Sequence, residues 1–175
     1  MHIDSDCEIN WDIVDLICPN FPIRRSSGLR LTRGADYGLR TVLYLARQPK
    51  GKLSRLKDIA AEQGVPPRFL AKVIQVLARA GLVRSSRGMH GGAALARDPG
   101  AVSIKDVIEA IEGPVAINLC LVGKGVCPRQ AGCPIYPVWR EAQRRMLEVL
   151  EATRFSDLVR GRPTRLNQKG GALQC

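Results

Sequence analysis

Two amphipathic helical segments separated by a short breaker constrain this fold more than any other feature of the chain. Apolar periodicity predicts a helix over 56–63 and a second helix over 67–80. The intervening sequence GVPP at 64–67 prevents one continuous helix, although a proline is tolerated in a first helical turn because its missing N–H has no partner there. Gly81 is suited to end the second helix in a left-handed conformation. Two helices joined by a tight, glycine-containing turn form the helix-turn-helix pattern.

The segments around these two helices complete a winged arrangement. Before them, apolar residues recur at helical spacing from Arg33, with Thr32 placed to cap the helix and Pro49 to end it. After them, short apolar strands at 82–84 and 93–95 flank turn-rich residues. This pattern predicts a hairpin directly behind the second helix, which is a wing.

A short helix and a long helix are predicted in the C-terminal part. Ser103 and Asp106 form a capping box, and the helix that they open ends at Gly113. Over 135–153 a broad apolar face recurs, and a last helical turn is expected over 155–159. The small body has little core left to cover the long helix, so a second subunit is the natural cover. The predicted fold class is therefore mainly α, a winged helix-turn-helix with a small β-hairpin wing and a long C-terminal dimerisation helix.

Positive charge is concentrated in one stretch of the chain. Residues 30–100 hold fourteen basic and four acidic side chains, a net +10 of the total of +11. Residues 1–29 carry a net −3, residues 101–160 a net +1 and residues 161–175 a net +3. Concentrated positive charge attracts a polyanion such as DNA, although charge alone describes a solvated basic surface equally well. The helix-turn-helix pattern inside the same stretch favours DNA.

The second helix of the pattern would lie in the major groove, with its first residues nearest the base edges. Arg68 is the predicted base contact, because a guanidinium can pair with guanine through two hydrogen bonds. Lys72 and Arg79 are suited to phosphates, and Gln75 shares their outward face. The apolar residues of this helix are Phe69, Leu70, Val73, Ile74 and Leu77.

The tip of the wing supplies two more candidates for DNA contact. Residues 85–92 read SSRGMHGG, and glycines let a backbone approach the duplex closely. Arg87 is suited to a narrow minor groove, and His90 is placed to touch a phosphate. The same glycines do not form a nucleotide-binding loop, because no Gly-Lys-Ser/Thr sequence follows them.

The two ends of the chain differ from its middle. Residues 1–29 are acidic, contain Pro19 and Pro22 and show no sustained period, so we predict a disordered extension and a native start near Leu29. We divide the remainder into a DNA-binding region at 30–100, a region at 101–160 with a dimerisation helix and a loop whose cysteines, described next, make it the candidate cluster-binding loop, and a disordered tail at 161–175. No apolar run approaches the roughly 18–20 residues that cross a bilayer, and no secretory signal is present. We therefore expect a cytoplasmic protein without a membrane partner.

Three cysteines lie close together in a Gly- and Pro-rich loop over 115–134. Cys120, Cys127 and Cys133 have the spacing C-x6-C-x5-C, in the flexible, helix-free backbone that thiolates need to converge on a soft metal. Three thiolates fit an iron–sulfur cluster with a fourth, non-cysteine ligand, or a zinc site. The paired spacing of zinc ribbons is missing, and an odd count of thiols in a reducing compartment fits a disulfide poorly. Inert buried thiols are the alternative to a metal site.

Taken together, these motifs resemble one bacterial family. It is the winged-helix iron–sulfur regulator family of the cluster regulator IscR and the nitric-oxide-sensing repressor NsrR, and the resemblance covers about residues 29–160. The stretch 103–113 and the three-cysteine loop are also similar. The other matching motifs are RLT at 30–32, LxxIAxxxGV at 56–65, AGLV at 80–83 and RGxxGG at 87–92.

The resemblance implies a homodimeric repressor that binds a pseudo-palindromic operator in double-stranded DNA, with a cluster that tunes its affinity. It implies that the three loop cysteines ligate the cluster, in a two-iron or a four-iron form. The cluster-regulator branch usually has a histidine three residues past the last cysteine, where this chain has Tyr136. The nitric-oxide branch uses an aspartate early in the first helix, and Asp36 matches it as the candidate fourth ligand, although a carboxylate there also complements the helix dipole. Ala93 stands where the family often has an aromatic residue.

The leading interpretation is a regulator whose cluster senses iron–sulfur status, redox state or nitric oxide. Loss or oxidation of the cluster would shift the loop and the adjoining helix, and so the spacing between the two recognition helices. The alternative keeps DNA binding and replaces the cluster with thiol redox or zinc sensing. An enzyme with a cysteine nucleophile needs a nearby base, and the only histidines are His2 and His90. We therefore predict no enzymatic activity.

Overall fold

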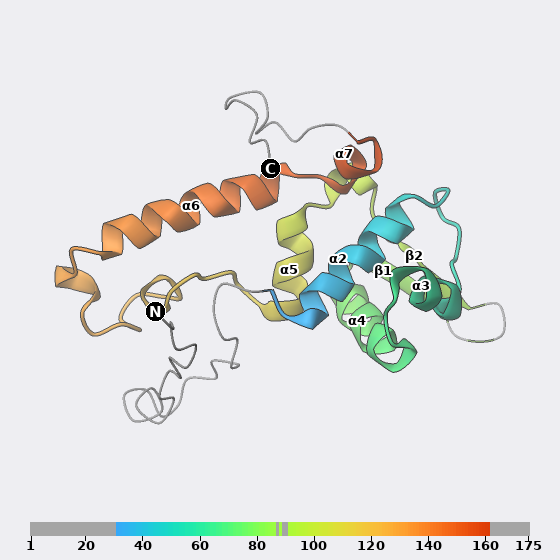
Figure 1. Ribbon diagram of the computed structural model, residues 1–175, viewed down its shortest axis with the longest axis horizontal. Coiled ribbons are helices and arrows are strands. Elements are labelled where there is room, and N and C mark those ends of the chain that lie inside the picture. The colour runs from blue at the N-terminus through green and yellow to red at the C-terminus, as the bar shows by residue number, and fades with distance from the viewer. Residues whose placement is uncertain (1–30, 87, 89–90, 162–175) are drawn as a thin grey trace, which may run out of the picture. The chain divides into compact units, whose positions relative to one another are not determined.

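A computed structural model describes residues 31–86, 88 and 91–161 (Figure 1). The chain divides into two units, 1–30 and 31–175, and the described residues all belong to the second. They form six α-helices, α2 to α7, and a two-stranded antiparallel sheet, which confirms the predicted mainly α class with a hairpin wing. The predicted N-terminal extension, the tail from residue 162, and the wing-tip residues Arg87 and His90 lie outside the described residues.

The first three helices begin and end where the sequence predicts. Helix α2 (Arg33–Ala46) is capped by Thr32, whose hydroxyl accepts a hydrogen bond from the amide of Ala35 at 3.3 Å. Helix α3 (Leu56–Gln63) ends at Gly64, which has a left-handed φ of +61° that L side chains rarely adopt. Helix α4 (Pro67–Arg79) opens on Pro67, and its apolar residues Leu70, Val73, Ile74 and Leu77 are buried.

The wing is attached to the body by a short backbone pairing. Strand β1 (Val83–Ser86) pairs with strand β2 (Gly92–Leu95). Ser54, just before α3, exchanges two backbone hydrogen bonds of 2.8 Å with Ala93, which is fully buried. Gly92 leaves room for this pairing, because a Cβ at that position would collide with the carbonyl group of Ser54. The wing is therefore held against the segment that leads into the helix-turn-helix.

The C-terminal part returns to the DNA-binding region. A 3-10 turn, η1 (Pro99–Ala101), precedes α5 (Ile104–Glu112), whose predicted capping box is present: the Ser103 hydroxyl accepts from the Asp106 amide at 3.1 Å. Helix α5 packs against α2, and Gly38 lets the two helices approach closely at Ile111. Two 3-10 turns, η2 (Leu119–Leu121) and η3 (Gln130–Gly132), interrupt the loop before α6 (Tyr136–Ala152).

The last helix, α7 (Phe155–Val159), closes the core. It packs against α2 and η1, and the Phe155 side chain is fully buried. The backbone amide of Phe155 donates to the carbonyl of Val102 at 3.1 Å, and the amide of Ile104 donates to the carbonyl of Thr153 at 3.1 Å. One hydrophobic core therefore contains side chains from Val42 to Phe155. No helix among the described residues is long and apolar enough to span a membrane.

Candidate nucleic-acid interface and cysteine loop

Helix α4 presents a cationic face on the side opposite its buried residues. We call the exposed side chains Arg68, Lys72, Gln75 and Arg79 the α4 face; they follow one another at intervals of four, three and four residues, which is one side of a helix. Burial of Leu70, Val73, Ile74 and Leu77 against the core fixes the direction in which the α4 face points. Within the described part of the chain, the three cations of the α4 face form no salt bridge, so their charges remain available to an anion.

A shallow hollow between the start of α3 and the wing adds cations that the sequence analysis missed. Arg55 and Lys57, at the start of α3, are exposed and line this hollow together with residues of the wing, namely Ser86, Gly88, Gly91 and Gly92. The N-terminus of a helix carries partial positive charge, which adds to the charge of the two side chains. Their position at the start of the first helix of a helix-turn-helix, where the chain approaches the DNA backbone, was the signal that could have identified them.

Arg84 on strand β1 has a structural contact instead. Its guanidinium Nη2 donates a hydrogen bond to the backbone carbonyl of Gly51 at 2.9 Å. This bond ties the wing to the turn after α2, so the wing is braced at both Ser54 and Gly51. The predicted DNA contacts at Arg87 and His90 fall outside the described residues.

The three loop cysteines are free thiols with different surroundings. Cys120 lies in η2 and is buried, whereas Cys127 and Cys133 are half-buried. Cys133 borders a second shallow hollow, which Pro128, Arg129, Gly132 and Pro134 also line. Among the described residues, no three Cys, His, Asp or Glu side chains lie close enough together to hold a metal ion.

The Gln130 side chain fixes the backbone of the cysteine loop through two hydrogen bonds. The Gln130 side-chain nitrogen donates to the carbonyl of Cys120 at 2.8 Å, and its oxygen accepts from the amide of Gly125 at 3.2 Å. A second amide performs a similar role at the start of the loop, where the Gln143 side-chain oxygen accepts from the amide of Ile117 at 3.1 Å. The loop is thereby tied both to itself and to α6.

Asp36, the candidate fourth ligand, lies in the first turn of α2 as predicted. Its carboxylate pairs with Arg40 one turn later at 2.9 Å, and both side chains are about half exposed. As a metal ligand it would have to leave this ion pair, which is worth little at an exposed site.

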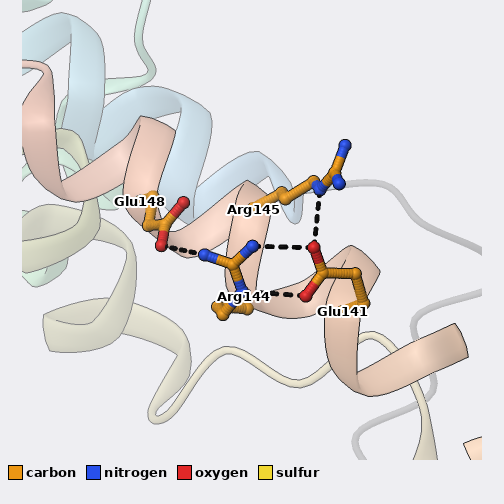
Figure 2. Close-up of polar contacts among 4 residues, drawn as sticks. All are labelled: Glu141, Arg144, Arg145 and Glu148. Atoms are coloured by element: carbon orange, nitrogen blue, oxygen red, sulfur yellow. Dashed lines mark hydrogen bonds and ion pairs between the residues drawn. The ribbon is translucent and has the colours of Figure 1, made fainter. Parts of the chain in front are cut away.

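Helix α6 has no buried residue and carries both charged and apolar exposed side chains. Glu141, Arg144, Arg145 and Glu148 form a network of ion pairs on one side, shown in Figure 2. Hydrogen bonds from Arg144 and Arg145 lower the pKa of Glu141 from 4.5 to about 2. At the start of the helix, the apolar side chains of Val138 and of Ile135, the N-cap residue of α6, are 64% and 55% exposed. Exposed apolar side chains of this size are suited to protein contact.

Comparisons with known proteins agree on one family of transcriptional regulators. The profile described as "Rrf2: Iron-dependent Transcriptional regulator" matches residues 31–161. Protein aau3 of Rhizobium meliloti is 37% identical over 136 residues, which span 77% of this chain and 88% of that protein. The HTH-type transcriptional regulator NsrR of Shouchella clausii is 35% identical over 132 residues, 75% of this chain and 89% of that protein.

Solved structures show the same likeness. IscR of T. potens superposes with a TM-score of 0.62 at 29% identity, over 77% of this chain and 88% of that one. CymR, described as the global cysteine regulator of B. subtilis, superposes with a TM-score of 0.59 at 27% identity, over 77% of this chain and 99% of that one.

Proposed function

Because the chain belongs to the Rrf2 family of iron-dependent transcriptional regulators, we propose that it is a homodimeric repressor whose affinity for a pseudo-palindromic operator depends on an iron–sulfur cluster. Like its relatives, the chain is a DNA-binding transcriptional regulator and not an enzyme. The observation that carries the DNA-binding part of the proposal is the α4 face, a row of exposed cations without ion-pair partners in the described chain, next to a braced wing. A repressor that acts on chromosomal DNA works in the cytoplasm.

In this proposal the α4 face enters the major groove of each half-site. Arg68, in the first turn of α4, contacts a guanine, because the first residues of a recognition helix lie nearest the base edges. Lys72 and Arg79 contact phosphates, which orient the protein without reading sequence. Gln75 lies between them on the same face, and an amide suits either kind of contact. Arg87 and His90 remain predicted contacts of the wing tip with the minor groove and a phosphate.

Salt dependence separates these roles in a binding experiment. The operator is first obtained by selection from a random duplex library with purified protein, and affinity is then measured over a range of salt concentrations. Lys72→Ala should reduce the slope of log affinity against log salt by about one for each phosphate that the variant no longer neutralises. Lys124→Ala removes the same charge from the cysteine loop and should leave the slope unchanged. Equal slopes for all three proteins would refute the placement of Lys72 on DNA.

The exposed apolar side chains at the start of α6 are the proposed dimer contact. A second copy would cover Ile135 and Val138, which this chain leaves in water. Two-fold symmetry then presents two α4 helices to half-sites about 34–36 Å apart. Val138→Glu should yield monomers in sedimentation experiments, whereas Glu148→Ala, farther along α6 in the ion-pair network, should remain dimeric. A dimeric Val138→Glu variant would place the interface elsewhere.

The donor set of the cysteine loop fits an iron–sulfur cluster in its chemistry. Cys120, Cys127 and Cys133 are free thiols within fourteen residues, and thiolates are the usual ligands of such clusters. The loop must bring these thiols closer together for ligation, because no three of the described side chains already form a metal site. Asp36 is the proposed fourth ligand. A bound cluster would supply a group that reacts with oxidants and nitric oxide.

Metal analysis decides between the cluster and its alternative. Protein purified without oxygen should contain iron and sulfide, and each of Cys120→Ser, Cys127→Ser and Cys133→Ser should lose both, whereas Cys175→Ser should keep them. The similarity to CymR, which is also known in an oxidised form from Staphylococcus aureus, favours thiol sensing as the second candidate. Iron-free protein whose operator affinity changes reversibly with oxidant would establish that alternative.

A further inference from the structure

Phe69 occupies an unexpected position for a phenylalanine. The sequence groups it with the apolar residues of α4, but its side chain is 45% exposed, whereas Leu70, Val73, Ile74 and Leu77 are buried. It lies in the first turn of α4. Among the large apolar side chains that the described residues leave exposed, it is the only aromatic one. Packing in the hydrophobic core therefore does not explain why a phenylalanine occupies this position.

Tyr37 holds the ring of Phe69 in a defined orientation. The two ring centroids lie 5.5 Å apart with an interplanar angle of 77°, an edge-to-face contact between α2 and α4. Tyr37 itself is half-buried, so it supplies a fixed support from the body. An exposed ring that is held in this way loses little conformational entropy when it meets a ligand.

The neighbours of Phe69 indicate which ligand this is. Arg68 precedes it, and Lys72 lies three residues later, close beside it on the helix surface. Both belong to the α4 face, so whatever approaches those cations also approaches the ring. A phenyl ring cannot hydrogen-bond a phosphate, but the major groove displays one apolar group, the 5-methyl of thymine, which phenylalanine contacts.

We infer that Phe69 is a specificity-determining residue that contacts the 5-methyl group of a thymine in each half-site. The inference rests on the proposed function, because it requires α4 to lie in the major groove. It adds a reading of thymine to the reading of guanine proposed for Arg68.

Deoxyuridine substitution tests the inference, because it removes only the methyl group. In the selected operator each thymine is replaced in turn by deoxyuridine, and affinity is measured for the wild type, Phe69→Ala and Phe69→Leu. For the wild type, one position in each half-site should weaken binding by about fourfold, the value of one buried methyl group. Phe69→Ala should be insensitive at that position, and Phe69→Leu should retain part of the effect. Arg68→Ala should bind more weakly overall and keep the full methyl effect.

The outcomes separate this inference from the proposed function. Wild-type protein that selects no duplex at any salt concentration would refute the proposed function itself. Wild-type protein that binds its operator but has the same deoxyuridine profile as both Phe69 variants would overturn only the role of Phe69. Melting temperatures of the variants confirm that folded proteins are compared, and Phe69→Leu provides the comparison if the alanine variant is unstable.

Discussion

Replacing Phe155 with alanine should destabilise the whole DNA-binding body, although the residue lies near the end of the described chain. The ring is fully buried and is among the largest such side chains of the described residues. It joins a core that also contains Val42 of α2, Ile59 of α3 and Leu77 of α4. Truncation of a buried phenylalanine to alanine costs about 3–5 kcal/mol, from the transfer free energy of the ring and the cavity left behind. For a body of this size that corresponds to a melting temperature lower by about 10–20 °C.

Thermal unfolding followed by far-UV circular dichroism measures this effect. Val159→Ala is the matched control, because Val159 lies in the same helix and is 38% exposed. The control should change the free energy of unfolding by less than about 0.5 kcal/mol. If the two variants melted at the same temperature, Phe155 would not belong to the core, and the packing of α7 on α2 would be wrong.

Three further predictions concern the wing, a cap and the charged face of α6. Gly92→Ala should lower both the melting temperature and DNA affinity, because its Cβ would lie 2.9 Å from the Ser54 carbonyl carbon, whereas Gly132→Ala, which meets no atom within 4 Å, should retain both. Ser103→Ala should cost about 1 kcal/mol in chemical denaturation, because the α5 cap is removed. Glu141 has a pKa lowered to about 2, so its ion pairs stabilise the fold above pH 4.5 and lose this effect as the pH falls to about 2. Glu141→Gln should therefore melt slightly below wild type at neutral pH and together with it at pH 2, and a difference that persists in acid would contradict this account.

The elements of the fold were predictable because local chemistry marks their ends. Gly64, Pro67 and the Ser103 cap each determine a boundary through backbone geometry that any protein would share. The packing between distant segments was not predictable in the same way. The periodicity around Phe155 indicates a helical turn but contains no information on its partner, which lies more than a hundred residues away in α2.

The candidate site shows the same difference between features that local sequence determines and features that depend on tertiary packing. The outward position of Arg68 and Lys72 follows from helical period once the buried side of α4 is known. The exposure of Phe69 does not follow, because its hydrophobicity alone predicts burial. Its contact with Tyr37 depends on how α2 packs against α4, which helical period does not specify. The pairing of Ser54 with Ala93 was missed for a similar reason, since a single bridge leaves no alternating pattern in the sequence.

The two hydrogen bonds of the Gln130 side chain affect how much the cysteine loop must still be ordered when its thiols bind a ligand. In a loop without internal hydrogen bonds, each residue that a ligand immobilises loses conformational entropy that costs about 1–2 kcal/mol of free energy. Gln130 already joins the carbonyl of Cys120 to the amide of Gly125, so part of that ordering precedes any ligand. In the proposed function, less of the free energy of ligand binding would then be spent on ordering the loop, and more would be left to shift α6.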